Sequence, residues 1–188
     1  MKLDKTSRTE LHRTFLIEAL PEPLTRASGH IQLFDNYIAE TRLRIRSIRI
    51  PETKEWTRIL QQRFPVDADQ LAGWKIAEIH LNEMEYEHFK IFEGTEIRKN
   101  RYFHEYDGRM FAFDVYLGRL WGLNRARIDF DNAEQLNEFE PPPFAVLEVT
   151  NEAFFSDENL VTRKFDEVQA QVSRLGSVTP LRLAVVDE

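Results

Sequence analysis

Arginine alternates with aliphatic residues at positions 41–46, TRLRIR, and this run constrains the fold more than any other feature of the chain. In a β-strand successive side chains point to opposite faces, so Arg42, Arg44 and Arg46 share one face and the aliphatic residues share the other. The aliphatic face can join a core. Three cations about 7 Å apart repel one another unless an anion lies across them. The run therefore predicts either a solvated edge strand, whose charges discourage aggregation, or an anion-binding face.

A second alternating basic segment occurs at positions 96–102, EIRKNRY, where Lys99 and Arg101 share a face. Two strands that each point cations inward would give a barrel with a basic interior. A closed barrel has no edge to protect, which favours the anion-binding interpretation. Guanidinium groups suit phosphate oxygens because they can grip two of them at once. We therefore expect phosphate groups to bind along these two strands.

Hydrophobic alternation and turn residues predict the fold class. Asp107 and Gly108, which lie between two extended runs, are typical of a hairpin turn. Helices are expected at 83–92, in a short segment from Asp131, and at 157–175. We predict an α+β fold, an antiparallel eight-stranded, barrel-like β-tunnel with peripheral helices, as a single domain over residues 1–188. Its strands are expected at 11–18, 31–38, 41–48, 56–62, 74–81, 96–103, 110–117 and 123–130.

Composition excludes several classes of function. The formal net charge of -7, from 25 basic and 32 acidic residues, argues against non-specific nucleic-acid binding. There is no cysteine, so thiolate metal sites and cysteine nucleophiles are excluded. No apolar run approaches about 18 residues, and the first residues lack the apolar core of a signal peptide. We expect a cytoplasmic protein without a membrane partner. It has no glycine-rich phosphate loop and no nucleophile elbow.

Four acidic residues occupy predicted strands, where carboxylates are disfavoured unless they are solvated or functional. They are Glu10, Glu78, Asp114 and Asp129. Among arginines, such carboxylates can be structural counter-ions or ligands of a hard cation such as Mg²⁺. The residues alone leave both interpretations open.

The order of these segments resembles the CYTH domain of the triphosphate tunnel metalloenzymes, over residues from about 8 to about 165. The opening strand at 10–17 is similar to the family's E-x-E-x-K strand. The segment at 42–44 resembles its Arg-x-Arg strand, and the one at 99–102 its Lys-x-Arg strand. Further matches are the strand 111–115 with its aspartate, the Gly-Leu and following strand at 122–130, and the proline-rich exit with Glu-Val-Thr at 141–150.

The resemblance implies an eight-stranded antiparallel tunnel whose basic interior holds a triphosphate and whose acidic residues bind Mg²⁺ or Mn²⁺. It implies three roles for residues of this chain. The phosphate ligands would be Arg42, Arg44, Arg46, Lys99 and Arg101. The catalytic carboxylates would be Glu10, Glu78 and Asp129, with Glu10 and Asp129 also holding the metal. Asp114, Arg127 and His12 would support the site.

The chain departs from the family pattern mainly where the family has carboxylates or lysines. His12 and Arg127 replace glutamates and Thr14 replaces a lysine. A family lysine would fall near Leu60 or Gln61, and a family glutamate near Ile76. The changes at His12 and Arg127 remove negative charge where a metal would bind.

Several functions are consistent with this pattern. The tunnel could bind a triphosphate, a polyphosphate or a phosphorylated metabolite, and could act as a divalent-metal-dependent triphosphatase. Alternatively, it could be a degenerate module that binds a polyanion without turnover. A weaker alternative is an adenylate cyclase, and a fourth is a barrel whose internal salt bridges bind nothing.

Overall fold

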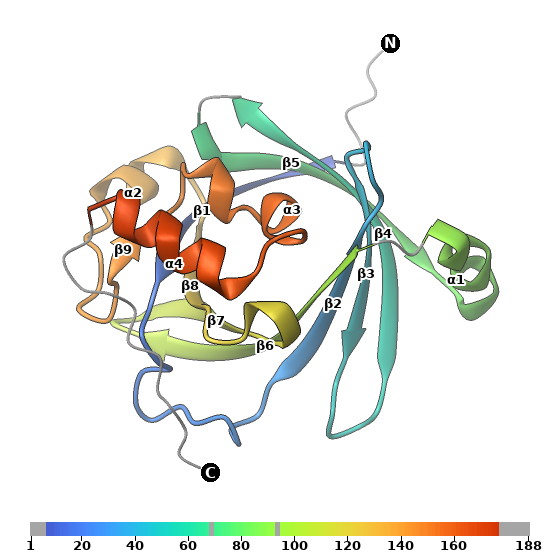
Figure 1. The fold of residues 1–188 in the computed structure, drawn as a ribbon, viewed down its shortest axis with the longest axis horizontal. Coiled ribbons are helices and arrows are strands. Elements are labelled where there is room, and N and C mark those ends of the chain that lie inside the picture. The colour runs from blue at the N-terminus through green and yellow to red at the C-terminus, as the bar shows by residue number, and fades with distance from the viewer. Residues whose placement is uncertain (1–6, 68–69, 93–94, 177–188) are drawn as a thin grey trace.

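Eight antiparallel strands close into a barrel around a polar interior (Figure 1). The computed structural model describes residues 7–67, 70–92 and 95–176. Neighbouring strands follow the order β5-β4-β3-β2-β6-β7-β8-β1, and β1 also pairs with β5, which closes the barrel. The predicted eight-stranded antiparallel tunnel is therefore confirmed. The strands are β1 (Ser7–Leu16), β2 (Ile31–Tyr37), β3 (Leu43–Arg49), β4 (Trp56–Asp67), β5 (Gln70–Leu81), β6 (Thr95–Tyr106), β7 (Arg109–Tyr116) and β8 (Asn124–Phe130).

Strand β1 changes partner along its length. Its first half, from Ser7 to Leu11, pairs with β5. Its last two residues pair with a short ninth strand, β9 (Leu147–Glu148), while β8 lies along its other edge. Because β5 and β9 share one edge of β1, the barrel closes along the first half of that strand.

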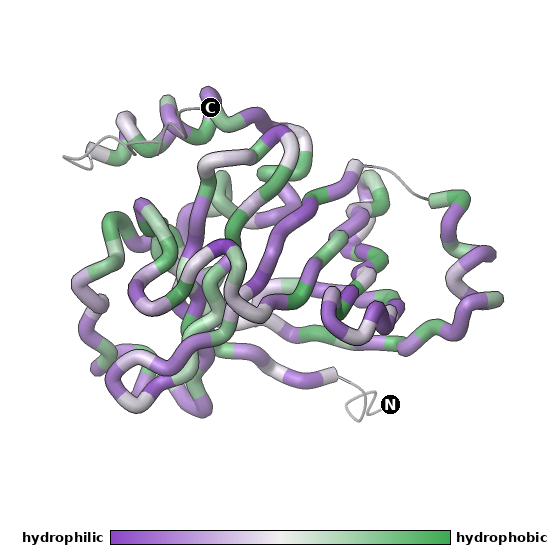
Figure 2. Tube along the Cα trace, turned by 90° about the horizontal axis from the view of Figure 1, so that it is seen from below, coloured by the Kyte–Doolittle hydropathy of each residue, from purple (hydrophilic) through white to green (hydrophobic). Residues whose placement is uncertain are grey.

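The apolar core lies largely outside the barrel wall. Along β1, β6, β7 and β8 the outward side chains form one cluster that includes Phe15, Tyr102, Phe113 and Ile128. The helix α2 (Ala133–Glu138) and the chain that follows it cover this cluster. Hydrophobic and hydrophilic residues alternate along the strands (Figure 2). The opposite faces of the same strands are therefore free to carry charges into the interior.

A second apolar cluster closes one end of the barrel. Helices α3 (Asp157–Leu160) and α4 (Phe165–Arg174) lie across this opening (Figure 1). Leu160, Val168 and Val172 pack there against inward side chains of the strands, such as Leu16 and Tyr116. The C-terminal helices thus act as a floor for the interior.

The prediction of a single helix at 157–175 is wrong in one respect, because this segment forms two helices, α3 and α4. Helix α3 ends at Leu160, and its C-cap residue Val161 is buried as well. Lys164 is extended (φ -114°, ψ 164°) and begins α4, where its backbone N–H donates to the Glu167 carboxylate at 2.9 Å. The predicted tail beyond residue 176 lies outside the described residues.

The helix expected at 83–92 is confirmed as α1 (Glu83–Phe89), followed by the short 3₁₀ helix η1 (Lys90–Phe92). Asn82 caps α1, and the helix buries none of its residues. It stands apart from the barrel in both views (Figures 1 and 2). Two further 3₁₀ turns are η2 (Gly118–Leu120) and η3 (Ala153–Phe155). None of the helices in the described ranges is long and apolar enough to cross a membrane.

Candidate functional site

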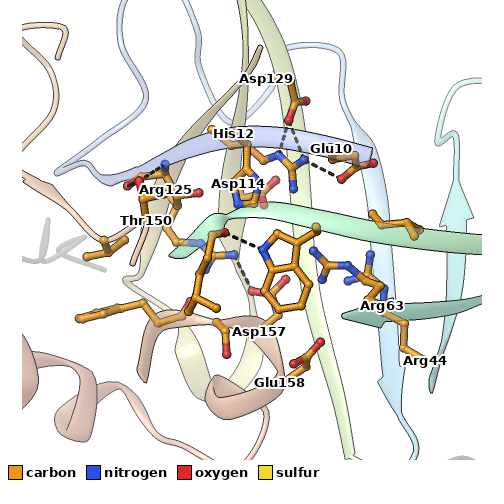
Figure 3. A pocket seen from close by; sticks show the side chains of 18 of the residues that line it. Glu10, His12, Arg44, Arg63, Asp114, Arg125, Asp129, Thr150, Asp157 and Glu158 are labelled. Carbon is orange, nitrogen blue, oxygen red and sulfur yellow. Dashed lines mark hydrogen bonds and ion pairs between the residues drawn. The ribbon is translucent and has the colours of Figure 1, made fainter. Parts of the chain in front are cut away.

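The barrel encloses a cavity of about 190 Å³ that is lined by charged side chains (Figure 3). Within the described residues, eight basic and six acidic side chains line it. A chain with a net charge of -7 therefore builds a cavity with an excess of cations. The basic residues are Arg8, Arg44, Arg46, Arg63, Lys99, Arg101, Arg125 and Arg127, and the acidic ones are Glu10, Asp114, Asp129, Glu152, Asp157 and Glu158.

The predicted cations of β6 point into the cavity, but both have counter-ions. Lys99 Nζ lies 2.9 Å from Asp114 and 2.7 Å from Asp157, and Arg101 Nε lies 2.6 Å from Asp114. Burial raises the pKa of Asp114, but Arg101 and Lys99 outweigh it and hold that pKa well below its usual range. Burial lowers the pKa of Lys99, an effect that the two carboxylates oppose. This part of the site is internally neutralised.

Asp157 at the start of α3 reaches the same place from the C-terminal segment. It accepts a hydrogen bond from the Tyr116 hydroxyl at 2.5 Å and also pairs with Arg125. Burial raises the pKa of Asp157, but Arg125 and Lys99 lower it far below its usual value. The sequence did not predict this role, because the pairing joins residues far apart in the chain.

The two arginines of β3 share a buried carboxylate that the sequence did not predict. Asp35 of β2 is fully buried and accepts from Arg46 Nε and Nη2, both at 2.6 Å. Arg44 Nη1 lies 3.4 Å from the same carboxylate, and its Nε donates to Gln61 Oε1 at 2.5 Å. Burial raises the pKa of Asp35, yet the two arginines lower it well below its ordinary value. Arg44 and Arg46 therefore stand in the cavity as expected, with Asp35 behind them.

The structure places Arg42 outside the cavity, which corrects the expected face of three arginines. Strand β3 begins only at Leu43, because the Thr41 hydroxyl accepts the Leu43 N–H at 3.1 Å and donates to the Ile38 carbonyl at 2.8 Å. This turn takes Arg42 out of the alternation. Its guanidinium lies 5.2 Å from the centre of the Phe64 ring and is exposed.

Arg63 of β4 is a cavity residue that the sequence analysis missed. Its side chain makes no hydrogen bond or ion pair with any described residue, and its Nε is buried without a partner. The guanidinium lies 4.6 Å from the centre of the Trp74 ring. Burial and then the charge of Arg44 lower its pKa to about 10, so it remains a cation at neutral pH. The exposed Glu158 also lines the cavity but makes no ion pair with Arg63 (Figure 3).

Arginines link the three predicted catalytic carboxylates in one series, and of these Glu10 and Asp129 line the cavity whereas Glu78 is not among its lining residues. Arg127 Nη2 lies 2.8 Å from Glu10 and 2.6 Å from Asp129, while Arg8 Nη2 lies 2.8 Å from Glu10 and 3.1 Å from Glu78. We call this series, Asp129–Arg127–Glu10–Arg8–Glu78, the rim chain. Burial raises the pKa of Glu10, but Arg127 and, more weakly, Arg8 reverse the shift and lower it.

His12 lies next to the rim chain, on the inner face of β1. It is 7% exposed, and its Nδ1 is buried with no hydrogen-bond partner. Burial and then the charge of Arg127 lower its pKa well below the usual value. The imidazole is therefore neutral at physiological pH and lies in the cavity wall. Thr14 and Ile76, two other departures from the family pattern, also line the cavity.

The carboxylates of the rim chain do not fit the Mg²⁺ or Mn²⁺ that the resemblance implies. A hard divalent cation requires several free oxygen ligands. Both oxygens of Glu10 are already bound by arginines, and no group of three or more His, Asp or Glu within the described ranges could hold a metal. A divalent cation about 4 Å from Arg127 would also be repelled by roughly 8 kcal/mol at an effective dielectric constant of about 20.

Solved structures with a similar fold include an inorganic triphosphatase. The crystal structure of the inorganic triphosphatase NE1496 superposes with a TM-score of 0.57 at 22% identity, over 82% of this chain and 95% of that one. The chain therefore shares the fold of this triphosphatase, as the resemblance to the CYTH domain predicted. PH1819 from Pyrococcus horikoshii OT3 has a TM-score of 0.45 at 15% identity, over 69% of this chain and 82% of that one. No protein-family model and no curated protein sequence matches the chain.

Proposed function

We propose that the charged cavity of this CYTH fold binds a small phosphate-containing anion, such as a triphosphate, a polyphosphate or a phosphorylated metabolite. Arg63 is the observation on which the proposal rests. A partly buried guanidinium without a counter-ion is costly to maintain, and an anion that enters the cavity would remove that cost. Arg44 and Arg46 lie close enough to add to the same positive field, since both contribute to the pKa shift of Arg63.

Phosphate suits this arrangement better than a carboxylate ligand would. A terminal phosphate offers three oxygens and more than one negative charge, so it can accept from several guanidinium groups at once. Lys99 and Arg101 already have counter-ions. They would therefore contribute to the electrostatic field and the shape of the cavity more than they would form new ion pairs with the anion. We propose Arg63 and Arg44 as the principal ligands, with Arg46 behind them.

Hydrolysis of the bound anion is the second candidate function, supported by the fold shared with an inorganic triphosphatase. Glu10, Glu78 and Asp129 belong to one series of ion pairs. Their oxygens, however, are engaged by Arg8 and Arg127. We therefore favour binding without metal-dependent turnover, and phosphate release from inorganic triphosphate is the assay that separates the two functions.

The test of binding is calorimetric titration of inorganic triphosphate into the wild-type chain and into Arg63→Gln, with and without Mg²⁺. Loss of a charge-assisted contact should weaken binding roughly 10- to 100-fold. Arg174→Gln is the matched control, because Arg174 is exposed at the end of α4 and makes no ion pair in the described ranges.

Stability measurements distinguish a binding role from a structural one. Arg63→Gln removes an unpaired buried charge, so its midpoint of thermal unfolding should equal or exceed that of the wild type. Wild-type protein that binds no triphosphate under either condition would refute the proposal. So would an Arg63→Gln variant that binds as tightly as the wild type.

A further inference from the structure

We infer that Arg127 takes the place of a divalent cation, so that the cavity binds its anion without metal and Mg²⁺ does not assist. This inference rests on the proposed binding function and specifies its chemistry. It follows from the rim chain, where fixed guanidinium groups occupy the positions between carboxylates that a metal would need. Figure 3 shows Glu10 and Asp129 with the dashed lines that join them to the guanidinium between them.

The guanidinium of Arg127 is held in place on one side. Nε and Nη2 donate to Asp129 Oδ1 at 2.9 and 2.6 Å, and Nη2 also donates to Glu10 Oε2 at 2.8 Å. The side chain is 18% exposed, whereas that of Asp129 is 64% exposed. Arg127 therefore lies inward of the solvated acid, between bulk water and the deeper cations of the cavity.

The other side of the same guanidinium is free. Nη1 of Arg127 makes no hydrogen bond with the described part of the chain, so its two N–H groups can donate to a ligand. Arg63 makes no ion pair within the described residues, and the charge of Arg127 is one of the causes that lower its pKa. The two guanidinium groups thus offer unsatisfied donors to one cavity from β8 and β4.

Placement of charge, more than net charge, explains why a fixed arginine could replace the metal. Eight basic and six acidic residues line the cavity, and Asp35 and Glu78 add two more counter-ions to lining arginines. The guanidinium group of Arg127 supplies a positive charge between Glu10 and Asp129 without any ion. An incoming Mg²⁺ would have to displace Arg127 and Arg8 from Glu10 before it could use either carboxylate oxygen.

The first experiment uses the wild-type chain and needs no variant. The wild-type chain should be titrated with Mn²⁺ alone, and binding should be monitored by calorimetry and by electron paramagnetic resonance. Neither method should show a saturable Mn²⁺ site. Inorganic triphosphate should bind in the presence of a chelator at least as tightly as with excess Mg²⁺, because Mg²⁺ sequesters the free anion. A saturable Mn²⁺ site that Glu10→Gln abolishes would overturn the inference.

Two variants then test Arg127 itself. Arg127→Gln should bind triphosphate in chelator at least about tenfold more weakly than the wild type. Arg127→Glu places a third carboxylate beside Glu10 and Asp129, so it should lose metal-free binding and gain a Mn²⁺ site. Arg174→Glu, the same charge reversal on an exposed helix end, should change neither property. Unchanged triphosphate affinity in Arg127→Gln would overturn the inference.

The outcomes separate this inference from the proposed function. If triphosphate binds neither with nor without metal, the binding function itself is refuted. If triphosphate binds only when Mg²⁺ is present, the binding function stands and the role assigned to Arg127 is wrong.

Discussion

Replacing Asp157 by asparagine tests how the closed end of the cavity is held together. The Asp157 carboxylate accepts from the Tyr116 hydroxyl, lies 2.7 Å from Lys99 Nζ and pairs with Arg125. Asparagine keeps the shape and one acceptor oxygen but removes the charge. Lys99 would retain Asp114 at 2.9 Å, whereas Arg125 would lose its ion pair and keep a hydrogen bond of 2.6 Å to the Phe155 carbonyl.

The expected loss of stability can be estimated from these contacts. Removing one partner of a buried ion pair costs about 3–5 kcal/mol, because the remaining charge is left uncompensated. We expect the lower end, about 3 kcal/mol, since Lys99 keeps a second carboxylate. For a chain of this size the thermal midpoint should then fall by roughly 6–12 °C.

Inorganic triphosphate should restore part of this loss. Saturation at about 100 times the dissociation constant adds about 2.7 kcal/mol to a protein that binds only in its folded state. The gain should be larger in Asp157→Asn than in the wild type, because the variant leaves Lys99 and Arg125 short of negative charge. Urea and thermal unfolding with and without triphosphate measure both effects.

Asp131→Asn is the control, because Asp131 is exposed and makes no ion pair within the described residues. It should change stability by no more than about 0.5 kcal/mol. An Asp157→Asn variant as stable as the wild type would show that Lys99 and Arg125 do not need this counter-ion. A variant destabilised as expected but unaffected by triphosphate would show that the anion does not reach the closed end.

Two further predictions concern the fold. The pKa values of Asp35, Asp114 and Asp157 are depressed by their cations, so the unfolded chain binds more protons in acid. Their stabilisation is therefore complete above about pH 4 and lost as the pH falls below it. Urea midpoints from neutral pH to about pH 2 should decline, and a flat profile would contradict these ion pairs. Leu160→Ala should cost about 2–5 kcal/mol in urea unfolding, because this last residue of α3 buries its side chain fully in the apolar cluster. A loss below about 1 kcal/mol would show that α3 is not packed as described.

Sequence reasoning succeeded where the structural signal is local. Strand alternation has a period of two residues, so the inward placement of Arg44, Arg46, Lys99 and Arg101 could be read directly from the chain. The same reasoning failed at Arg42, where a turn closed by the Thr41 hydroxyl ends the alternation. Serine, threonine and asparagine side chains commonly compete with strand pairing in this way.

Arg63 was missed because the strand expected at 56–62 ends one residue before it. The structure continues β4 to Asp67 and accommodates the proline with a shift of register between Pro65 and Asp67. Proline is tolerated in a sheet at such irregularities. Reading β4 through position 65 would have placed Arg63 on the same face as Gln61, and so inside the barrel.

The counter-ions were the least predictable part of the site. Asp35 faces Arg46 across two paired strands, and Asp157 meets Lys99 from 58 residues away in sequence. Such pairs depend on register and on the path of the C-terminal helices, which no short pattern encodes. The sequence therefore indicated where cations would gather without indicating how many of them were already neutralised.

That distinction decides what the cavity can do. Arg46, Arg101 and Lys99 are fixed by buried carboxylates, so they are positioned before any ligand arrives and lose little side-chain entropy when one binds. Within the described residues, donors without a hydrogen-bond partner include Nε of Arg63 and of Arg125, Nη2 of Arg44 and Nη1 of Arg127. Affinity should consequently depend on Arg63, Arg44 and Arg127 more than on Lys99 and Arg101, whose charges are already neutralised. A scan that replaces each lining cation in turn should then separate stability from binding, since the paired cations maintain the barrel and the unpaired ones hold the anion.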